Sequence, residues 1–206
     1  MVVIIDYDAG NLTSVERSLR ALGEAPLVTP EAETVLRASR VVFPGVGAAG
    51  AAMATLKSRG LDEALQGVFA RGIPILGICL GAQIILEASE ENDAPCLGLL
   101  PGRTRALPRR AGLKIPHMGW NRVRFLREHP VFRGLPEGAE FYFVHSYFPD
   151  PADPALVLGA THHGVDFPSA VGGRNLVATQ FHPEKSGRFG LQILKNFLAW
   201  DGAGAQ

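Results

Sequence analysis

A cysteine between two glycines is the first candidate for chemistry. Cys79 lies in the segment Gly77-Ile78-Cys79-Leu80-Gly81, where an apolar stretch that predicts a strand meets a stretch that predicts a helix. A nucleophile on such a sharp turn needs small residues two places on either side, because larger side chains there would clash. The free N–H groups of the following helix stabilise a thiolate and can bind a developing oxyanion. We therefore expect Cys79 to be a nucleophile, with an ordinary buried cysteine as the alternative.

A histidine and a glutamate in the segment Phe181-His182-Pro183-Glu184 could supply the base that a thiol nucleophile needs. The segment follows an apolar stretch, so we expect His182 at the end of a strand. Glu184 can orient the far ring nitrogen of His182 if the proline keeps the backbone extended. Taken by themselves, His182 and Glu184 could simply lie in a surface turn. Taken together with Cys79, they predict a Cys-His-Glu triad.

A glycine-rich segment, GVGAAG at residues 45–50, follows one predicted strand and opens a predicted helix. Its spacing matches the dinucleotide-binding fingerprint, which makes a nucleotide-binding module the main alternative of another class. That fingerprint needs an acidic residue about 20 positions on, at the end of the next strand. Asp62 and Glu63 come near that distance but fall in a stretch that predicts a helix. The other use of such a loop is as flexible backbone whose N–H groups bind a reacting carbonyl.

Several other polar residues are expected to carry no chemistry. No carboxylate or cysteine cluster accompanies His162 and His163, and adjacent side chains diverge on a strand, so we expect both to be exposed and no metal to be bound. Cys96 is expected to be a packed or loop thiol. Arg109 and Arg110 predict a solvated turn, because no glycine-rich backbone adjoins them to form a phosphate site.

The composition of the 206-residue chain excludes several classes of protein. Hydrophobic residues make up 47% and charged residues 19%, which is enough apolar material for a folded core. Twenty basic and twenty acidic side chains give a net charge of zero, which disfavours nucleic-acid binding. Two cysteines exclude a disulfide scaffold, and the longest uncharged stretch, residues 72–86, is too short for a membrane span. We therefore expect a single cytoplasmic domain over residues 1–206 that needs no cofactor.

The elements that must position these residues follow an alternating order. Strands that are apolar on both faces alternate with helices in the first half, which predicts a mostly parallel central sheet with helices on both faces. After Pro101, stretches of alternating polarity predict antiparallel additions at an edge of that sheet. The expected strands are 2–6, 41–43 and 73–78, the expected helices are 12–22, 48–58, 61–71, 80–88 and 188–200, and the alternating stretches are 122–125, 140–147 and 156–180.

Six segments, spread in order over the whole chain, carry a resemblance to a known family. They are Asp6-Tyr7 with Gly10-Asn11, PGVG at 44–47, GICLGAQ at 77–83, PHMGWN at 116–121, VHSY at 144–147 and FHPEKS at 181–186. They resemble the class I (triad) glutamine amidotransferases and, within them, the glutaminase subunits of imidazole glycerol phosphate synthases. Ala82 stands where that family commonly has Met, and Asp8 where it has Gly; neither position supplies a catalytic side chain.

The resemblance implies a set of roles. Cys79 attacks the side-chain amide of glutamine, His182 acts as base and then acid, and Glu184 orients His182. The N–H of Leu80 and a peptide N–H of Gly45, Val46 or Gly47 form the oxyanion hole. The residues that match the glutamine pocket are Gln83, His145, Ser146 and Tyr147.

The resemblance also implies a partner. Ammonia passes to a (β/α)₈-barrel cyclase in a heterodimer, which makes imidazole glycerol phosphate and aminoimidazole carboxamide ribotide in histidine biosynthesis. Aromatic and Met residues are typical interface anchors, although Trp120 could also close an edge of the core. The expected partner surface comprises Asn11, Met118, Trp120, Tyr142 and Lys185. Glutaminase subunits that serve other pathways share the triad and stay an alternative; only residues 116–121 and 144–147 favour the histidine pathway.

Overall fold

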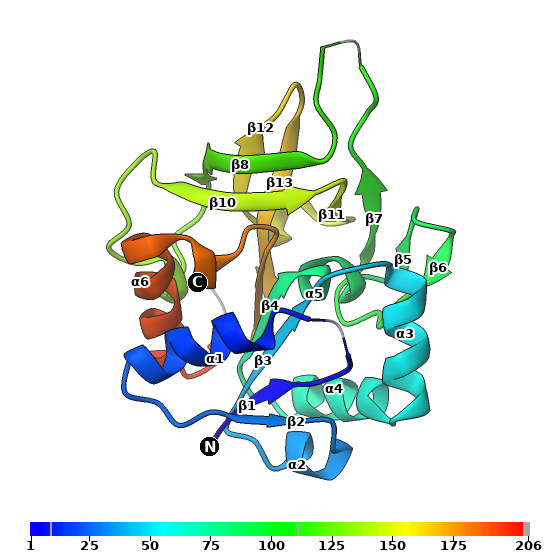
Figure 1. Cartoon of the computed structure of the whole chain (residues 1–206), viewed down its shortest axis with the longest axis vertical. Helices are drawn as coiled ribbons and strands as arrows, with labels where there is room; N and C mark the ends of the chain where they lie inside the picture. The colour runs from blue at the N-terminus through cyan, green and yellow to red at the C-terminus, as the bar shows by residue number, and fades with distance from the viewer. Residues whose placement is uncertain (9, 111, 204–206) are drawn as a thin grey trace.

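A computed structural model describes residues 1–8, 10–110 and 112–203 (Figure 1). Helices and strands alternate through the first half, and strands dominate the second. In chain order the elements are β1 (Val2–Ile5), α1 (Leu12–Ala21), β2 (Leu27–Thr29), α2 (Ala32–Leu36), β3 (Arg40–Gly45), α3 (Ala49–Ser58), α4 (Leu61–Ala70), β4 (Ile75–Cys79), α5 (Leu80–Ile84), β5 (Ala88–Ser89), β6 (Ala94–Pro95), β7 (Gly102–Ala106), β8 (His117–Arg122), β9 (Arg124–Phe125), η1 (Pro130–Phe132), β10 (Glu140–His145), β11 (Tyr147–Pro151), η2 (Pro154–Leu156), β12 (Val157–His162), β13 (Asp166–Gly173), β14 (Leu176–Thr179), η3 (Pro183–Lys185) and α6 (Gly187–Ala199).

The central sheet has eight strands in the order β2-β1-β3-β4-β14-β13-β12-β9. The first five run parallel to one another, and β13, β12 and β9 extend the sheet in antiparallel fashion. All residues of β1, β4 and β14 are buried, as expected for strands with helices on both faces. The predicted α/β class, with a parallel centre and an antiparallel edge, is therefore confirmed.

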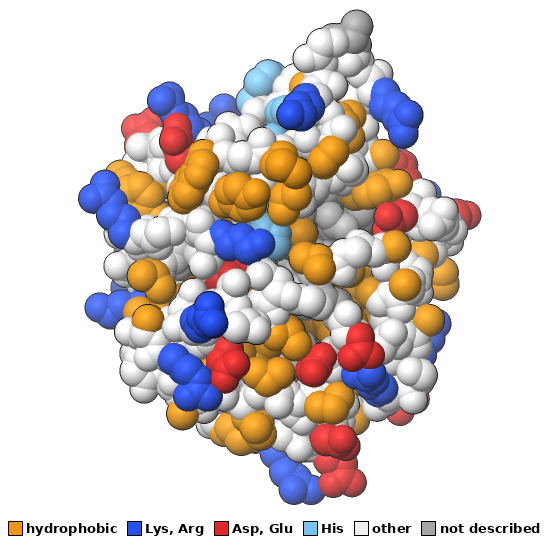
Figure 2. Space-filling view, in the orientation of Figure 1, with side chains coloured by type: hydrophobic (Ala, Val, Ile, Leu, Met, Phe, Trp, Pro, Cys, Tyr) orange, Lys and Arg blue, Asp and Glu red, His pale blue; other side chains and the backbone are white. Residues whose placement is uncertain are grey.

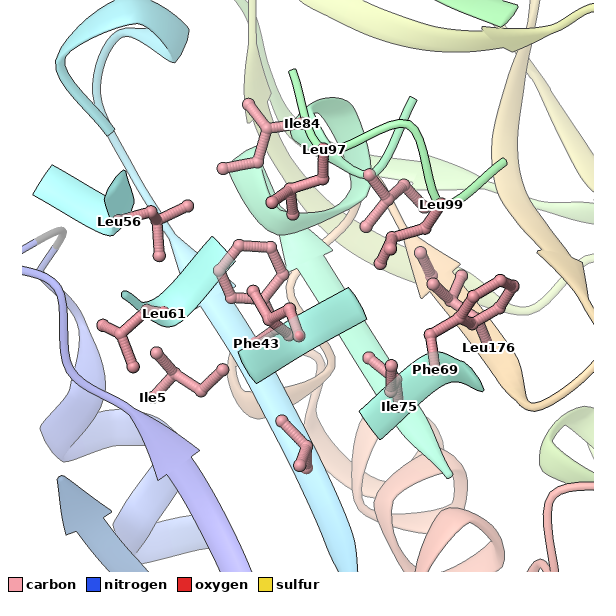
Figure 3. Close-up of a cluster of buried hydrophobic side chains, with 14 of the residues drawn as sticks. Ile5, Phe43, Leu56, Leu61, Phe69, Ile75, Ile84, Leu97, Leu99 and Leu176 are labelled. Atoms are coloured by element: carbon pink, nitrogen blue, oxygen red, sulfur yellow. The ribbon is translucent and has the colours of Figure 1, made fainter. Parts of the chain in front are cut away.

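Helices cover both faces of this sheet and make two cores. In Figure 1, α1 and α6 lie to the left of the sheet, and α3 and α4 to the right. One core joins β-strand side chains to α2, α3, α4 and α5; Figure 3 shows its packing around Phe43 and Ile75. The other core joins the opposite face to α1 and α6, through side chains such as Leu19 and Phe197. None of the helices among the described residues combines the length and the apolar composition of a membrane span.

Three predicted assignments were wrong. The stretch 156–180 was expected at the antiparallel edge, but its last strand, β14, lies inside the sheet and runs parallel to β4. Residues 140–147 do not extend the central sheet: β10 pairs with β8, and β11 pairs with β7 in a separate four-stranded sheet. The chain bends at Ser146, so the alternating stretch is divided between two sheets. The helix predicted over residues 80–88 ends at Ile84. The prediction overshot because every residue from 80 to 86 is buried, and a continuous apolar run does not show where a helix ends.

Several short elements had no prediction. The β2 strand has three residues and the α2 helix five, which is too short for a periodic pattern to stand out. The stretch 122–125, which was predicted as one strand segment, is divided between two sheets. Its first residue, Arg122, ends β8, which pairs with β10, and Arg124 begins β9, which pairs with β12.

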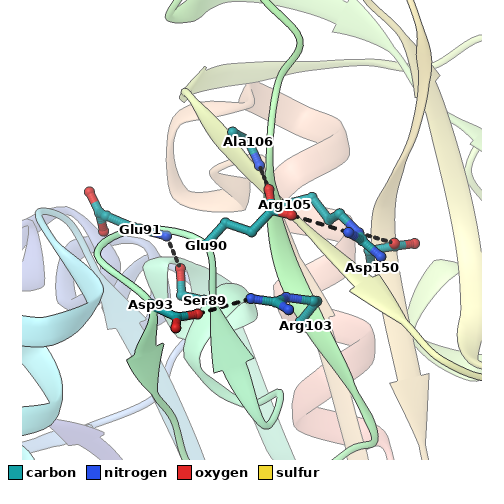
Figure 4. Close-up of polar contacts among 8 residues, drawn as sticks. All are labelled: Ser89, Glu90, Glu91, Asp93, Arg103, Arg105, Ala106 and Asp150. Carbon is teal, nitrogen blue, oxygen red and sulfur yellow. Dashed lines mark hydrogen bonds and ion pairs between the residues drawn. The ribbon is translucent and has the colours of Figure 1, made fainter.

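The four-stranded sheet β11-β7-β5-β6 is joined by polar contacts (Figure 4). Glu90 accepts a hydrogen bond from the Ala106 N–H at 2.9 Å and from Arg105 at 3.1 Å. The backbone N–H of Ala106, more than the guanidinium, lowers the pKa of Glu90. Arg105 also donates to Asp150 at 2.8 Å. Each of these exposed ion pairs contributes little stability. They lie beside the β5–β6 turn, whose Glu91 side chain accepts a hydrogen bond from the Ala49 N–H at 2.6 Å.

Candidate active site

The predicted nucleophile lies on a strained turn between β4 and α5. Cys79 has φ +55° and ψ −106°, a backbone conformation that side-chain-bearing residues rarely adopt, and its side chain is buried. A Cβ on Gly81 would lie 1.9 Å from the Phe43 carbonyl oxygen, and one on Gly77 would lie 2.9 Å from the Ala178 Cβ. Only glycine fits on either side of Cys79, so the turn is held by close backbone packing.

The structure brings the predicted base and its orienting carboxylate together. His182 Nδ1 and Glu184 Oε1 are 2.8 Å apart, and both side chains are fully buried. The sequence analysis expected an extended backbone at Pro183 to set the distance between the two side chains, and that expectation was wrong. His182 is extended, but Pro183 begins the short η3 turn, which brings Glu184 back toward the ring. Asn11 also donates a hydrogen bond to Glu184 Oε1 from its side-chain amide.

The charges around His182 favour its protonated form. Burial by itself lowers the pKa of His182, but the neighbouring sulfur of Cys79 and the carboxylate of Glu184 outweigh it and raise the pKa to about 9. Within the described residues, His182 Nε2 has no hydrogen-bond partner. That nitrogen is therefore available for proton exchange with Cys79 or with a bound substrate.

The glycine loop lies beside the nucleophile. The register of β3 and β4 places Gly45 directly opposite Cys79, and the loop then continues through exposed Val46 and Gly47. Gly47 has φ +105°, which favours glycine. At the far end of the loop, the Ala49 N–H donates to Glu91 Oε2 at 2.6 Å.

The acidic residue of a dinucleotide site is not where the fingerprint needs it. Asp62 and Glu63 lie in the first turn of α4 rather than at the end of a strand. The loop instead begins at Gly45, directly opposite the Cys79 turn. Leu80, the other expected donor, is the first residue of α5.

The residues expected in the glutamine pocket converge on the same region. Gln83 Nε2 donates to the Tyr147 carbonyl at 2.9 Å and to Gln180 Oε1 at 3.0 Å. His145 is buried, and its Nδ1 lies 2.8 Å from the same carbonyl oxygen, while Ser146 is half-buried between them.

Two residues near Cys79 were missed by the sequence analysis. Gln180 is fully buried, and its amide Nε2 lies 3.7 Å from the Cys79 sulfur. Tyr7 is also buried, and within the described chain its hydroxyl has no hydrogen-bond partner. Burial, and then the electrostatic effect of the nearby Cys79 sulfur, raise the pKa of Tyr7. The only available signal was proximity in sequence to the motifs at 6–11 and 181–186, which does not specify where a side chain points.

The expected partner surface is exposed on one face. Figure 2 shows a row of hydrophobic side chains over β8 and β10. Met118 is 58% and Trp120 56% exposed, and the Trp120 ring meets Tyr142 edge-on, with centroids 6.3 Å apart. Lys185 Nζ lies 5.9 Å from the centroid of Tyr142. Asn11 differs from the others, because its amide binds Glu184 in the interior.

The histidine pair at the end of β12 departs partly from expectation. His162 is exposed and bonds Asp166 at 2.7 Å. His163 is half-buried instead, and it stacks on His117 with ring centroids 4.1 Å apart. The two rings therefore have different partners, and no group of three or more metal-binding side chains occurs among the residues that the structure describes.

Comparisons with known proteins agree with this geometry. The family model "Glutamine amidotransferase class-I" matches residues 3–200. An "Imidazole glycerol phosphate synthase subunit HisH" of Dehalococcoides mccartyi is 48% identical over 96% of each chain, and one of Moorella thermoacetica is 49% identical over 95% of this chain and 93% of the relative. A solved structure described as a glutamine amidotransferase has a TM-score of 0.76 at 18% identity and covers 98% of this chain and 100% of its own. PurLQS from Thermotoga maritima has a TM-score of 0.74 at 18% identity, covering 96% and 97%.

Proposed function

This chain belongs to the class-I glutamine amidotransferase family, and we propose that it releases ammonia from glutamine through Cys79, His182 and Glu184. It acts as the glutamine amidotransferase subunit of an imidazole glycerol phosphate synthase in histidine biosynthesis. The observation that carries the catalytic proposal is the juxtaposition of Cys79, on its strained turn, with the buried His182–Glu184 pair. We also propose that residues 1–206 form one domain and that the protein acts in the cytoplasm.

The chemistry proceeds in two halves. The Cys79 sulfur attacks the side-chain carbonyl carbon of glutamine, and His182 holds the proton that the thiol gives up. The C–N bond then breaks as His182 returns that proton to the leaving nitrogen, which leaves as ammonia. A γ-glutamyl thioester remains, and water attacks it while His182 takes a proton from the water. The C–S bond breaks, and glutamate and free Cys79 result.

The loop and the helix start supply the charge stabilisation. During each attack the carbonyl oxygen becomes an oxyanion, which the Leu80 N–H and a peptide N–H of Gly45, Val46 or Gly47 bind. The position of Gly45 opposite Cys79 supports this assignment. Gln83, His145, Ser146 and Tyr147 form the wall that receives glutamine.

The product ammonia is consumed by a partner subunit. Ammonia in water at neutral pH is mostly protonated and no longer nucleophilic, so a dry path to the acceptor keeps it reactive. We propose a (β/α)₈-barrel cyclase as the partner, seated on the exposed surface around Met118 and Trp120. That surface is apolar at its centre and carries Lys185 beside Tyr142, which suits a protein interface.

The test replaces the nucleophile in the full-length subunit assembled with its cyclase. Cys79→Ser should abolish imidazole glycerol phosphate synthesis from glutamine and leave synthesis from ammonium salts within about twofold, because the cyclase reaction does not use the thiol. Cys96→Ser is the matched control and should leave both activities unchanged. Glutamine-dependent turnover that survives Cys79→Ser, or ammonia-dependent turnover that is lost with it, would refute the proposal.

A further inference from the structure

A continuous series of hydrogen bonds joins strand β8 to the Cys79 sulfur. Asn121 Nδ2 lies 3.1 Å from His117 Nε2, and His117 Nδ1 lies 2.8 Å from His145 Nε2. The series continues through the Tyr147 carbonyl, which both His145 Nδ1 and Gln83 Nε2 approach, to Gln180 and then Cys79. We call this series the relay; its members are Asn121, His117, His145, the Tyr147 carbonyl, Gln83 and Gln180.

Backbone carbonyls fix the direction of every bond at the histidine end of the relay. A carbonyl oxygen only accepts, so His145 Nδ1 must carry the proton that it shares with Tyr147. Neutral His145 then accepts on Nε2, and His117 must donate from Nδ1 and accept on Nε2. Asn121 is held as a donor, because its Nδ2 also donates to the His162 carbonyl at 2.9 Å and its Oδ1 accepts from the Arg122 N–H at 2.8 Å.

The same logic fixes the glutamine end. Gln83 Nε2 faces the Tyr147 carbonyl, which only accepts, so that atom is a donor. Gln180 Oε1 receives the second N–H of Gln83, and the Gln180 Nε2 is therefore the atom that points at the sulfur. An N–H directed at sulfur interacts more strongly with a thiolate than with a thiol.

We propose that Gln180 is a positioning residue for the Cys79 sulfur, and that the relay from β8 holds Gln180 in the orientation this requires. The inference rests on the proposed catalytic role of Cys79. It adds a physical link between two faces of one strand: His117 and Asn121 lie on the inner face of β8, and Met118 and Trp120 lie exposed on its outer face.

The surroundings keep both histidines neutral. Burial and the facing His163 lower the pKa of His117 to about 4. Burial, and then the facing histidines His117, His163 and His182, lower the pKa of His145 to about 3, although the bond to Tyr147 opposes this. The directional argument therefore holds throughout the neutral pH range.

The test compares two buried histidines in the full-length subunit. His117→Phe keeps an aromatic ring stacked against Phe143, where the centroids are now 4.8 Å apart, and removes both nitrogens from the relay. His129→Phe is the matched control: His129 is 6% exposed against 4% for His117, its pKa is also lowered to about 4, and it packs against Trp200, away from Cys79. Each variant is treated with iodoacetamide, and the alkylation rate of Cys79 is followed by mass spectrometry of its peptide.

His117→Phe should lower the alkylation rate of Cys79 and kcat for glutamine about five- to tenfold, which corresponds to the loss of roughly one hydrogen bond. His129→Phe should change both by less than twofold. His117→Asn, whose amide nitrogen can replace Nδ1 as donor to His145, should recover most of the loss. Gln180→Leu should show the same defect as His117→Phe, because it removes the last donor directly.

Equal effects of His117→Phe and His129→Phe, or an unchanged alkylation rate in both His117→Phe and Gln180→Leu, would overturn the proposal. The alkylation arm needs no glutamine, so it reports on the sulfur even if the proposed glutaminase activity fails. If the alkylation rates of Cys79 change as expected but the subunit has no glutaminase activity, the proposed function alone is contradicted.

Discussion

The close approach of Tyr7 to the glycine loop makes a sharp prediction. A Cβ on Gly45 would lie 1.9 Å from the Tyr7 hydroxyl oxygen, whereas real Cβ atoms essentially never come within 3.0 Å of another heavy atom. Gly45→Ala therefore forces one of the two to move by about 1 Å. Tyr7 cannot swing away easily, because it is 1% exposed and its ring packs against Phe43 with centroids 5.4 Å apart.

The expected cost of Gly45→Ala follows from that overlap. Overpacking of a buried site costs roughly 1–3 kcal/mol, and an overlap of this size belongs at the upper end of that range. A displacement of about 1 Å at an oxyanion loop should lower kcat by about a hundredfold, with less effect on KM. Urea denaturation measures the first quantity, and steady-state glutaminase kinetics measure the second.

Removal of the hydroxyl should relieve the overlap. In Tyr7→Phe, the nearest atoms to the added Cβ become the ring carbon Cζ and the Leu80 Cβ, both at 3.1 Å, which small shifts can accommodate. The double variant should therefore recover about 1–2 kcal/mol of the free energy of unfolding relative to the sum of the single variants. Tyr7→Phe alone should be neutral or stabilising, because the hydroxyl is buried and has no hydrogen-bond partner among the described residues.

Gly47→Ala is the control for this cycle. A Cβ there meets no atom within 4 Å, so its cost comes only from the φ of +105°. Tyr7→Phe should leave that cost unchanged. If Tyr7→Phe recovers the same free energy of unfolding in Gly45→Ala and Gly47→Ala, or recovers none in either, then the Tyr7 hydroxyl is not the reason why position 45 requires glycine.

Three further outcomes follow from the site. Glu184→Gln should lower the pKa of His182, now raised to about 9, and reduce kcat about a hundredfold or more, as followed by NMR titration and kinetics; a change below fivefold would contradict the assigned role. Three other histidines are buried with lowered pKa values: His117, His129 and His145. Unfolded histidine binds a proton near pH 6.5 and these do so only near pH 3–4, so the free energy of unfolding should fall by several kcal/mol as pH falls from about 6.5 to 4. Urea midpoints that stay constant from pH 7 to pH 5 would disprove this. Trp120→Ala should weaken cyclase binding about tenfold or more in calorimetry while the isolated subunit stays equally stable, and an unchanged affinity would remove Trp120 from the interface.

Much of the fold follows from local patterns along the chain. The fully apolar strands β1 and β4 were predicted within two residues at each end, because burial on both faces leaves a continuous apolar run. The helix after β1 was also predicted to within one residue, whereas the helix after β4 ends four residues before the predicted end. The assignment of residues 140–147 failed for a physical reason. Alternating polarity says that a strand is half-buried, but it does not say which sheet the strand joins.

The site divides in the same way. The sequence by itself determined the reactive turn, since glycines two places either side of Cys79 mark a sharp turn between a predicted strand and a predicted helix. The structure then shows the close contacts with Phe43 and Ala178 that require those glycines. The sequence also placed a histidine and a glutamate within reach of each other. Only the tertiary structure decided that Gln180, 101 residues further along the chain, points its amide at the Cys79 sulfur. Contacts between distant segments depend on how strands and helices pack, and the direction of a buried amide depends on the carbonyls that packing brings beside it, which no local pattern encodes.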